Sequence, residues 1–408
     1  MLKKKTLLVI VAVLFLLVLS PAAWAKPDIE GEAGILMDMK TGKVLWTKNP
    51  DIKRAPASTT KILTALVALE KGNLQDLVKV SSNVKKIDGT KVWLRPGEEV
   101  TLENLLYAML VNSANDAALA IAEHIGGSVE GFAKMMNTKA KELGAKNSHF
   151  VNPHGLDQEG HYTTARDLAI IAREAMNNEK FREIVQTKKK EWNGMDWKSH
   201  LVNNNKLLWQ YEGATGVKTG YTSNAGRCLV ASARKGEQEF LSVVLGSTTQ
   251  AFYEDSMALL DYGFDNFKQV TLVEKGQKVS EIRVAGQIVP VVAAESFELL
   301  VDKGNFVLPK WEIQIKKSAA PIKKDRKIGT LSLIIEDKEI ASVPLLAGST
   351  VPKGLTWLDW YFRVTAAIFG LVFLSLLIKI LRKRKKSKIM YGGSGRSTSL
   401  DYRAMRKL

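Results

Sequence analysis

Short runs of alternating apolar and polar residues stand near both ends of the first two-thirds of the chain. Residues 34–48 carry two such runs on either side of Lys40-Thr41-Gly42, which predicts a β-hairpin with Gly42 in its turn. Residues 226–234 and 239–248 carry two further runs and predict another pair of strands. This first copy of the Lys-Thr-Gly tripeptide is therefore explained as a turn and requires no chemistry.

Between these strands the apolar residues recur at helical spacing. Residues 56–73 have apolar positions three and four apart, with Pro56 before them and Gly72 after them, and predict a helix. Further helical runs cover residues 101–127, with a break around Asn112 to Asn115, then 164–178 and 256–267. A strand hairpin, several helices and then strands again predict an α+β fold in which early and late strands share one sheet.

The pattern changes from about Gln269 onward. Short alternating runs such as "SEIRVAG", "WEIQIKK", "IGTLSLIIED" and "KEIASVPLL" follow one another, with Gly, Pro and Lys between them. This pattern of short alternating runs predicts a small all-β domain over residues 266–346. A linker over residues 347–356 would join it to the last part of the chain.

The net charge of +17 suggests a nucleic-acid partner until its location is considered. Residues 379–408 carry +10 and the first 25 residues carry +3, so that residues 26–378 keep only +4. A DNA-binding protein would carry its basic patch on the folded part of the chain. Nucleic acid is therefore not expected as a partner.

The first 25 residues have the organisation of a signal peptide. Lys3 to Lys5 precede an apolar run from Leu7 to Leu19, and Ala23-Trp24-Ala25 supplies a small-x-small cleavage site. The mature protein would then begin at Lys26. The alternative is a retained membrane anchor, against which only the cleavage site argues.

A second apolar segment lies near the other end and predicts a transmembrane helix over residues 357–381. Its core runs from Val364 to Leu381, with Lys379 as the single charge, and an interfacial helix would need a polar face that this segment lacks. Tryptophan and tyrosine precede the core, and a basic block from Arg382 to Lys386 follows it. The positive-inside rule then predicts a single-pass membrane protein with an extracytoplasmic catalytic domain and a cytoplasmic tail over residues 382–408.

Ser58 and Lys61 form the first candidate for chemistry. Three residues apart at the start of a predicted helix, they lie on one face and within reach of each other. A serine hydroxyl becomes an effective nucleophile when a nearby base takes its proton, and lysine serves as that base only when burial or another cation lowers its pKa. Alone, the spacing occurs by chance about once or twice in such a chain and favours a helix cap with a solvated lysine.

Two further motifs make the combination more specific. Ser113-Ala114-Asn115 stands between two helical runs, where its side chains would face a cleft. The second copy of the tripeptide, Lys218-Thr219-Gly220, opens a strand, where Gly220 would leave room for a substrate backbone and Lys218 would supply the second cation. Each motif alone is ordinary, but their order and their predicted positions favour one serine-based active site.

With these motifs the chain resembles the low-molecular-mass penicillin-binding proteins, the serine-type D-alanyl-D-alanine carboxypeptidases. The residues that carry the resemblance are Ser58-Thr59-Thr60-Lys61, "NSANDAA", "HGLD" at 154–157, "ARDLA" at 165–169 and "VKTGYT". It covers residues 27–265 and, more loosely, 266–346. It implies a β-lactamase/transpeptidase-like catalytic domain over residues 26–265, with a five-stranded, mainly antiparallel sheet flanked by helices.

The resemblance also implies a function and a set of site residues. The expected activity is removal of the terminal D-alanine from peptidoglycan stem peptides that end in D-Ala-D-Ala, with β-lactam antibiotics as covalent inhibitors and with no cofactor or metal. The implied catalytic residues are Ser58, Lys61 and Ser113. The implied substrate-binding residues are Asn115, Lys218, Thr219, Gly220, Tyr221 and Thr222.

One position departs from the family. Several relatives carry an arginine shortly after the next strand, and it helps to hold the terminal carboxylate of the substrate. The corresponding stretch here, "LGSTTQAFYEDS", has none. Either Lys218, Thr219 and Thr222 hold the carboxylate alone, or Arg227 assists.

Three rival functions are weaker. A class A β-lactamase needs a deacylating glutamate, and Glu174 lies unfavourably inside an amphipathic helix. A zinc peptidase needs histidine ligands, but the five histidines show no His-Glu-x-x-His spacing. A catalytically weak protein that only binds penicillin or peptidoglycan remains an alternative, although the complete serine and lysine set argues against it.

Cys228, the single cysteine, is expected to lie in a buried strand and not to act as a nucleophile.

Overall fold

The computed structural model describes residues 26–316, 318–353 and 357–390, so that the predicted signal peptide and residues 391–408 of the predicted tail lie outside the described residues. The chain forms two compact units. One comprises the chain up to Val270 together with Leu299–Phe306. The other comprises Thr271–Glu298 and the chain from Val307 onward.

A five-stranded antiparallel sheet forms the centre of the first unit. Its order is β2-β1-β9-β8-β7, so the early hairpin lies directly beside the late strands. The strands are β1 (Ala33–Asp38), β2 (Val44–Lys48), β7 (Ala214–Thr222), β8 (Gly226–Lys235) and β9 (Gln238–Ser247). The predicted α+β fold, with early and late strands in one sheet, is confirmed. Strand β7, which carries the second tripeptide, is an edge strand.

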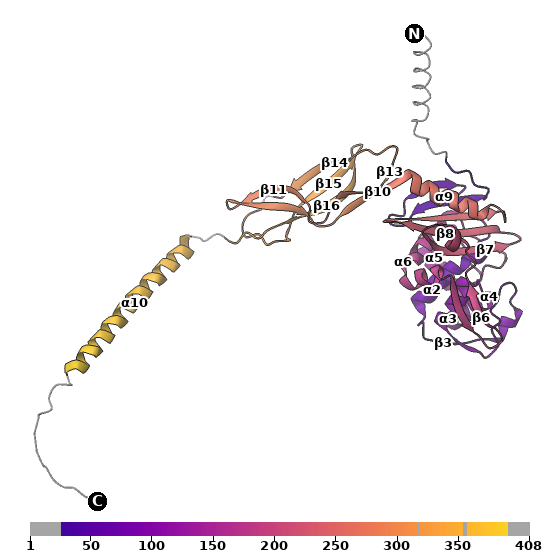
Figure 1. Ribbon diagram of the computed structural model, residues 1–408, viewed down its shortest axis with the longest axis horizontal. Coiled ribbons are helices and arrows are strands. Elements are labelled where there is room, and N and C mark those ends of the chain that lie inside the picture. The colour runs from indigo at the N-terminus through magenta and orange to yellow at the C-terminus, as the bar shows by residue number, and fades with distance from the viewer. Residues whose placement is uncertain (1–25, 317, 354–356, 391–408) are drawn as a thin grey trace, which may run out of the picture. The chain divides into compact units, whose positions relative to one another are not determined.

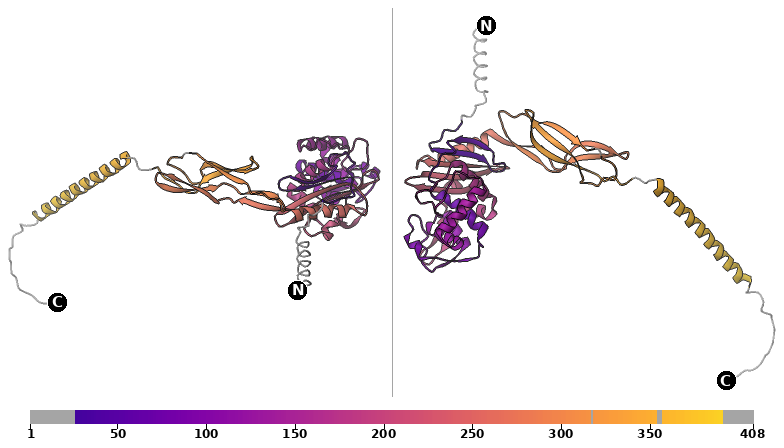
Figure 2. Two further views of the ribbon diagram at one scale, coloured as in Figure 1. Left: turned by 90° about the horizontal axis from the view of Figure 1, so that it is seen from above. Right: turned by 180° about the vertical axis from the view of Figure 1, so that it is seen from behind.

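Helices cover both faces of this sheet (Figures 1 and 2). Because side chains alternate along a strand, Leu36 and Val244 pack with α9 (Phe252–Asn266) on one face. Ile35 and Val243 pack into the larger core on the other face. That core contains α2 (Lys61–Lys71), α3 (Leu102–Val111), α4 (Asn115–Gly126), α5 (Val129–Glu142), α6 (Ala165–Asn177) and α7 (Glu179–Gln186).

The remaining elements of this unit are short. They are the 3₁₀ helices η1 (Ala57–Thr60) and η2 (Ser82–Lys86), the helix α8 (Leu207–Gln210) and the strands β3 (Leu77–Lys79), β4 (Glu99–Thr101), β5 (Lys189–Asn193) and β6 (Lys198–Val202). Strands β3 and β4 pair with each other, as do β5 and β6. The sequence pattern indicated none of these four strands.

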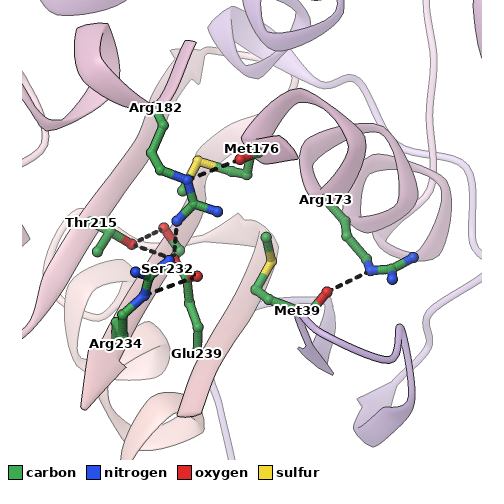
Figure 3. A network of polar contacts seen from close by, with 8 residues as sticks. All are labelled: Met39, Arg173, Met176, Arg182, Thr215, Ser232, Arg234 and Glu239. Atoms are coloured by element: carbon green, nitrogen blue, oxygen red, sulfur yellow. Dashed lines mark hydrogen bonds and ion pairs between the residues drawn. The ribbon is translucent and has the colours of Figure 1, made fainter. Parts of the chain in front are cut away.

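A buried carboxylate connects the sheet to helix α7 (Figure 3). The two oxygens of Glu239 on β9 accept from Arg182 of α7 at 2.6 Å and from Arg234 of β8 at 2.7 Å. Thr215, at the start of β7, hydrogen-bonds to Ser232 at 2.7 Å and donates to Glu239 at 3.2 Å. This network holds the beginning of the edge strand against its neighbours, and the tripeptide follows three residues later.

The first Lys-Thr-Gly tripeptide lies in the turn between β1 and β2. Arg173 of α6 donates to the carbonyl oxygens of Met39 and Lys40 at 2.8 and 3.0 Å (Figure 3 shows the contact to Met39). Gly42 has a φ of +74°, which favours glycine. The predicted hairpin is confirmed, and this tripeptide contributes a turn that packs on α6.

The second unit contains a five-stranded antiparallel sheet of order β11-β12-β16-β15-β14 and shares in a two-stranded ribbon of β10 and β13. The strands are β10 (Phe267–Val273), β11 (Lys278–Val284), β12 (Gln287–Ala293), β13 (Phe297–Asp302), β14 (Lys310–Ile315), β15 (Lys327–Ile335) and β16 (Lys338–Ala347). Their inward side chains form a separate core that includes Val289, Leu331 and Leu345. The predicted small all-β domain is confirmed.

A long helix, α10 (Trp357–Met390), follows the β-rich sheet. Its segment Trp357–Arg384 is long and apolar enough to cross a membrane, and none of its most apolar part is buried against other described residues.

Candidate active site

Ser58 lies on η1, the single 3₁₀ turn that leads into α2. The residue before it, Ala57, has a φ of +48°, a strained conformation for a residue with a side chain. The loop around Gly155 packs directly on this turn, because a Cβ atom at Gly155 would lie only 1.8 Å from the carbonyl oxygen of Ala57. The turn that presents the Ser58 hydroxyl is therefore held from the side of the predicted "HGLD" segment.

Lys61 begins α2 and is fully buried. Its Nζ lies 2.9 Å from Ser58 Oγ, 2.7 Å from Asn115 Oδ1 and 2.7 Å from the carbonyl oxygen of His154. Two of these three partners, the amide oxygen and the carbonyl oxygen, are able only to accept. They therefore direct two N–H bonds of the amine away from Ser58, and the third tetrahedral position of the nitrogen faces the serine hydroxyl.

The second buried lysine is Lys218, on β7, with 1% of its surface exposed. Burial lowers the pKa of Lys218 to about 7. The pKa of Lys61 is lowered well below its ordinary value, chiefly by burial and further by the charge of Lys218, while the carboxylate of Asp116 opposes the shift. Both shifts favour the neutral form of these amines, and a neutral Lys61 is suited to accept a proton.

Ser113 and Asn115 enter the site from the junction of α3 and α4. Ser113 is buried and has a φ of +67°, which bends the chain where the helical run breaks. Besides accepting from Lys61, Asn115 donates through Nδ2 to the carbonyl oxygen of Asp88 at 2.7 Å, and its backbone N–H donates to the carbonyl oxygen of Thr90 at 2.7 Å. These contacts fix the orientation of the Asn115 amide with its oxygen toward Lys61.

Gly220 brings the edge strand against the serine. A Cβ atom at this position would lie 2.9 Å from the backbone nitrogen of Ser58, 3.0 Å from Ala57 Cβ and 3.2 Å from the carbonyl oxygen of Pro56. The side-chain-free residue thus allows β7 to pass directly beside η1. Since β7 is an edge strand, its outer backbone groups are open to an extended ligand.

A cavity of about 560 Å³ opens at this junction. It is lined by Ser58, Thr90, Ser113, Asn204, Lys206, Gln210, Thr219, Gly220, Tyr221, Arg227, Thr249, Phe252 and Tyr253. Five of the residues predicted to bind or react therefore line one space, namely Ser58, Ser113, Thr219, Gly220 and Tyr221. Its size suits a short peptide or a drug-sized molecule.

Arg227, which is paired with Tyr221 across β7 and β8, forms part of the cavity wall. Its guanidinium lies 4.5 Å from the ring centroid of Tyr221 and 5.5 Å from that of Phe252, and its Nε donates to Thr249 at 3.2 Å. Stacking and one hydrogen bond hold the cation in place while the side chain stays partly exposed.

Thr222 lies at the end of β7, and its hydroxyl donates to Asp157 at 2.8 Å and accepts from the N–H of Ala225 at 3.1 Å. It is not among the residues that line the cavity. The sequence does not predict the cavity residues Asn204, Lys206 and Gln210, nor the contact of the His154 carbonyl with Lys61. The first three come from a segment with no motif, and a backbone carbonyl leaves no trace in side-chain identity.

The buried histidines are neutral and take structural positions. Burial lowers the pKa of His154 to about 3 and that of His161 to about 4. His161 Nε2 lies 2.9 Å from Thr60 Oγ1. Within residues 26–316, 318–353 and 357–390, no group of three His, Cys, Asp or Glu side chains is arranged to hold a metal ion. Cys228 is buried in β8, and burial raises the pKa of its thiol to about 11.

Comparison with known proteins gives consistent matches. Residues 20–249 match the D-alanyl-D-alanine carboxypeptidase family, and residues 267–353 match the C-terminal domain of penicillin-binding protein 5. The chain is 37% identical over 370 residues to the D-alanyl-D-alanine carboxypeptidase DacF of Bacillus subtilis, a match that covers 86% of this chain and 95% of that protein.

Solved structures agree. Penicillin-binding protein 5 from Haemophilus influenzae superposes with a TM-score of 0.64 at 33% identity, covering 80% of this chain and 99% of that one. A mutant of the Streptomyces K15 DD-transpeptidase superposes with a TM-score of 0.56 at 36% identity, covering 59% of this chain and all of the other.

Proposed function

Because the chain belongs to the family of serine D-alanyl-D-alanine carboxypeptidases, we propose that Ser58 is the nucleophile that this activity requires. The family removes the terminal D-alanine from peptidoglycan peptides and binds β-lactams. The single observation that carries the assignment is the amine of Lys61, which is fully buried and lies 2.9 Å from Ser58 Oγ.

The first step is acylation. As a neutral amine, Lys61 donates its two N–H bonds to Asn115 and to the carbonyl of His154, and its lone pair then faces the hydroxyl of Ser58. Lys61 takes the hydroxyl proton while Ser58 Oγ attacks the carbonyl carbon of the penultimate D-alanine. No rotation of the lysine is needed, because its two acceptors already set the direction of the lone pair.

The negative charge that develops on the carbonyl oxygen needs preorganised donors. We assign these to the backbone N–H groups of Ser58 and Tyr221. The assignment is supported by the close approach at Gly220, which brings strand β7 within van der Waals distance of the Ser58 backbone.

The leaving group must then receive a proton. Ser113 lines the same cavity as Ser58, and we propose that it relays the proton from Lys61 to the nitrogen of the departing D-alanine as the C–N bond breaks. Asn115 would hold the peptide amide of the substrate. Water then attacks the ester on Ser58, a proton returns to the serine oxygen, and the shortened peptide leaves with a new carboxylate.

The terminal carboxylate of the substrate needs cationic and hydroxyl partners. We propose that Lys218 supplies the buried positive charge and that Thr219 donates a hydrogen bond. Arg227 lines the same cavity as Thr219, and its guanidinium, which stacks on Tyr221, supports the view that it assists. Thr222, whose hydroxyl already donates to Asp157, would act by shaping the end of β7.

We also propose a location. The apolar helix Trp357–Arg384 would span the cell membrane, with the predicted signal peptide removed, the two folded units outside and the basic tail in the cytoplasm. This topology places the cavity on the side of the membrane where peptidoglycan lies.

Two measurements test the function. Detergent-solubilised full-length protein should release D-alanine from a pentapeptide that ends in D-Ala-D-Ala, and mass spectrometry should find a penicilloyl adduct on the peptide that contains Ser58. A chelator should leave both unchanged. Acylation without D-alanine release would favour the alternative of a penicillin-binding protein with little turnover, and an adduct on another serine would refute the assignment of the nucleophile.

A further inference from the structure

The β-rich unit carries a cluster of cations at the end from which the chain leaves for α10. The segment between β14 and β15, described over residues 316 and 318–326, is called the basic loop here. Its exposed cations are Lys316, Lys323, Lys324 and Arg326, while Lys327 begins β15 and Lys353 follows β16. Asp325 is the acidic residue in this loop. The end of the unit is therefore strongly positive.

Backbone hydrogen bonds fix the basic loop against the departing strand. Asp325 N–H donates to the carbonyl oxygen of Ala347 at 2.8 Å, and Ala347 N–H donates to that of Arg326 at 2.9 Å. Ile322 and Val351 exchange backbone hydrogen bonds at 2.9 and 2.8 Å, and both side chains are buried. The position of the loop is thus set by the core of the unit.

The length of the chain places this loop near the membrane. Val351 precedes Trp357, the first residue of α10, by six positions. An extended chain spans at most about 3.5 Å per residue, so the two residues are no more than roughly 20 Å apart in any orientation of the unit. Trp357 and Trp360 are the side-chain type that favours the membrane–water interface.

The turn between β11 and β12 lies at the same end, because β12 pairs with β16 through Val291 and Ala347 and continues past it toward the turn. Ile288, in β12 just after this turn, is 56% exposed. Beside this turn is a cavity of about 450 Å³ lined by Ile282, Arg283, Val284, Ile315, Lys316 and Ser318. Its apolar walls and two cations suit an anionic amphiphile.

The opposite end of the sheet has the opposite character. The turn from β15 to β16 carries Glu336, Asp337 and Glu339, with Lys338 among them. The β15–β16 turn is therefore net acidic even though Lys310 also lies at this end, whereas the end where the chain departs is basic.

We propose that the basic loop and the β11–β12 turn form a docking surface for the head groups of anionic phospholipids in the outer leaflet. The inference rests on the membrane anchoring proposed above. Anionic lipid attracts nearby Lys and Arg side chains and repels the acidic turn at the far end. Contact at the basic end would hold the β-rich unit upright on the membrane.

The test uses the full chain in vesicles with a fluorophore on a single new cysteine. Cys228 is buried, so that Ala319→Cys provides one accessible thiol in the basic loop and Glu339→Cys provides one at the acidic end. Vesicles contain phosphatidylcholine alone or with phosphatidylglycerol, and a trace of lipid with a quencher on its head group. We expect quenching at position 319 only with phosphatidylglycerol, and little at position 339 in either vesicle.

Variants that remove lysine charges distinguish binding of lipid by the basic loop from general attraction of a basic protein to an anionic vesicle. Lys323→Gln with Lys324→Gln should abolish the quenching at position 319, as should salt near 1 M, where the Debye length is about 3 Å. The matched control, Lys310→Gln with Lys338→Gln, removes two charges at the far end and should change nothing.

The outcomes are distinguishable. If the chain fails to float with phosphatidylcholine vesicles, both the anchoring and the docking surface are refuted. If it floats but position 319 is quenched equally in both vesicles, or both double variants act alike, only the docking surface is refuted. Binding of a soluble polyanionic wall polymer by the loop, without quenching in anionic vesicles, would assign the cations to that polymer and also overturn the proposal.

Discussion

Adding one methyl group at Gly220 should slow acylation without unfolding the protein. The new Cβ would lie 2.9 Å from Ser58 N, 3.0 Å from Ala57 Cβ and 3.2 Å from the Pro56 carbonyl oxygen. Two of these neighbours are backbone atoms, one of Ser58 in η1 and one of Pro56 just before it, and the third is a Cβ atom, so no side chain is able to rotate out of the way. Strand β7 and the serine turn must therefore separate.

The required separation sets the size of the effect. Relaxing a 2.9 Å contact to an ordinary one of about 3.4 Å or more requires roughly half an ångström of movement, and a misplacement of about 1 Å costs up to ~10²-fold in rate. We therefore expect Gly220→Ala to react with a fluorescent penicillin about ten-fold more slowly. The rate constant is measured by stopping the reaction at intervals and quantifying labelled protein on a gel.

A control separates local geometry from loss of stability. Gly236, in the β8–β9 turn, has a φ of +60° and no neighbour within 4 Å of an added Cβ. Gly236→Ala should cost about 1–2 kcal/mol through its backbone conformation, which lowers Tm by a few degrees, and should leave acylation unchanged. If Gly220→Ala keeps its Tm and reacts at the parent rate, the close approach of β7 to Ser58 plays no part in positioning the reacting groups.

Four further predictions address the charges, the carboxylate and the division of the chain. Lys218→Ala should slow acylation by roughly 10²-fold or more, because it removes a cation from the site, whereas Lys40→Ala should react like the parent; equal losses would reverse the roles of the two tripeptides. Arg227→Ala should reduce kcat/KM for a peptide with a free terminal carboxylate by about ten-fold, with partial rescue by lysine and no effect on the corresponding amide; an equal loss on both peptides would contradict carboxylate binding. The free energy of unfolding should rise with pH from about 7 toward 10, because over this range the unfolded chain holds a proton that Lys218 has lost in the folded state. Lys218→Met should reduce this slope by about 1.4 kcal/mol per pH unit, as measured by urea titrations across that range. A slope that the variant leaves unchanged would contradict the lowered pKa of Lys218. A fragment over residues 26–265 that is shown to fold should still be acylated at Ser58, and a folded but unreactive fragment would mean that the β-rich unit contributes to the chemistry.

The parts of the fold that the sequence predicted share one property, which is strong segregation of apolar side chains. Strands β8 and β9 are almost continuously buried in their middle residues, and α6 has a clear apolar face. The sequence pattern does not predict the hairpin of β5 and β6, because Trp192 and Leu201 are its only buried side chains. Its remaining residues show no alternation of apolar and polar positions. A polar hairpin of this kind is stabilised by backbone pairing, which sequence pattern does not report.

The features of the candidate site also divide into those that the sequence predicts and those that it does not. Ser58, Lys61 and Asn115 were identifiable from their spacing and from the resemblance, and their side chains meet around one nitrogen atom. The carbonyl of His154, which completes that arrangement, belongs to the backbone and was not predictable from residue type. The sequence leaves the role of Arg227 open, because its stacking on Tyr221 depends on the register of β7 and β8, in which these two residues are paired.

The two Lys-Thr-Gly tripeptides show how surroundings create chemistry from identical residues. Lys40 is exposed in a turn, and an added Cβ at Gly42 would meet the side chain of Arg173. Lys218 is 1% exposed, and an added Cβ at Gly220 would meet the backbone of Ser58. Because Lys218 lies in a region with little water, its pKa is lowered to about 7, and its charge in turn lowers the pKa of Lys61. An exposed lysine has no such influence on a distant base, because solvent screens it. The role that we propose for the second tripeptide therefore rests on its place on an edge strand beside the half-buried Ser58.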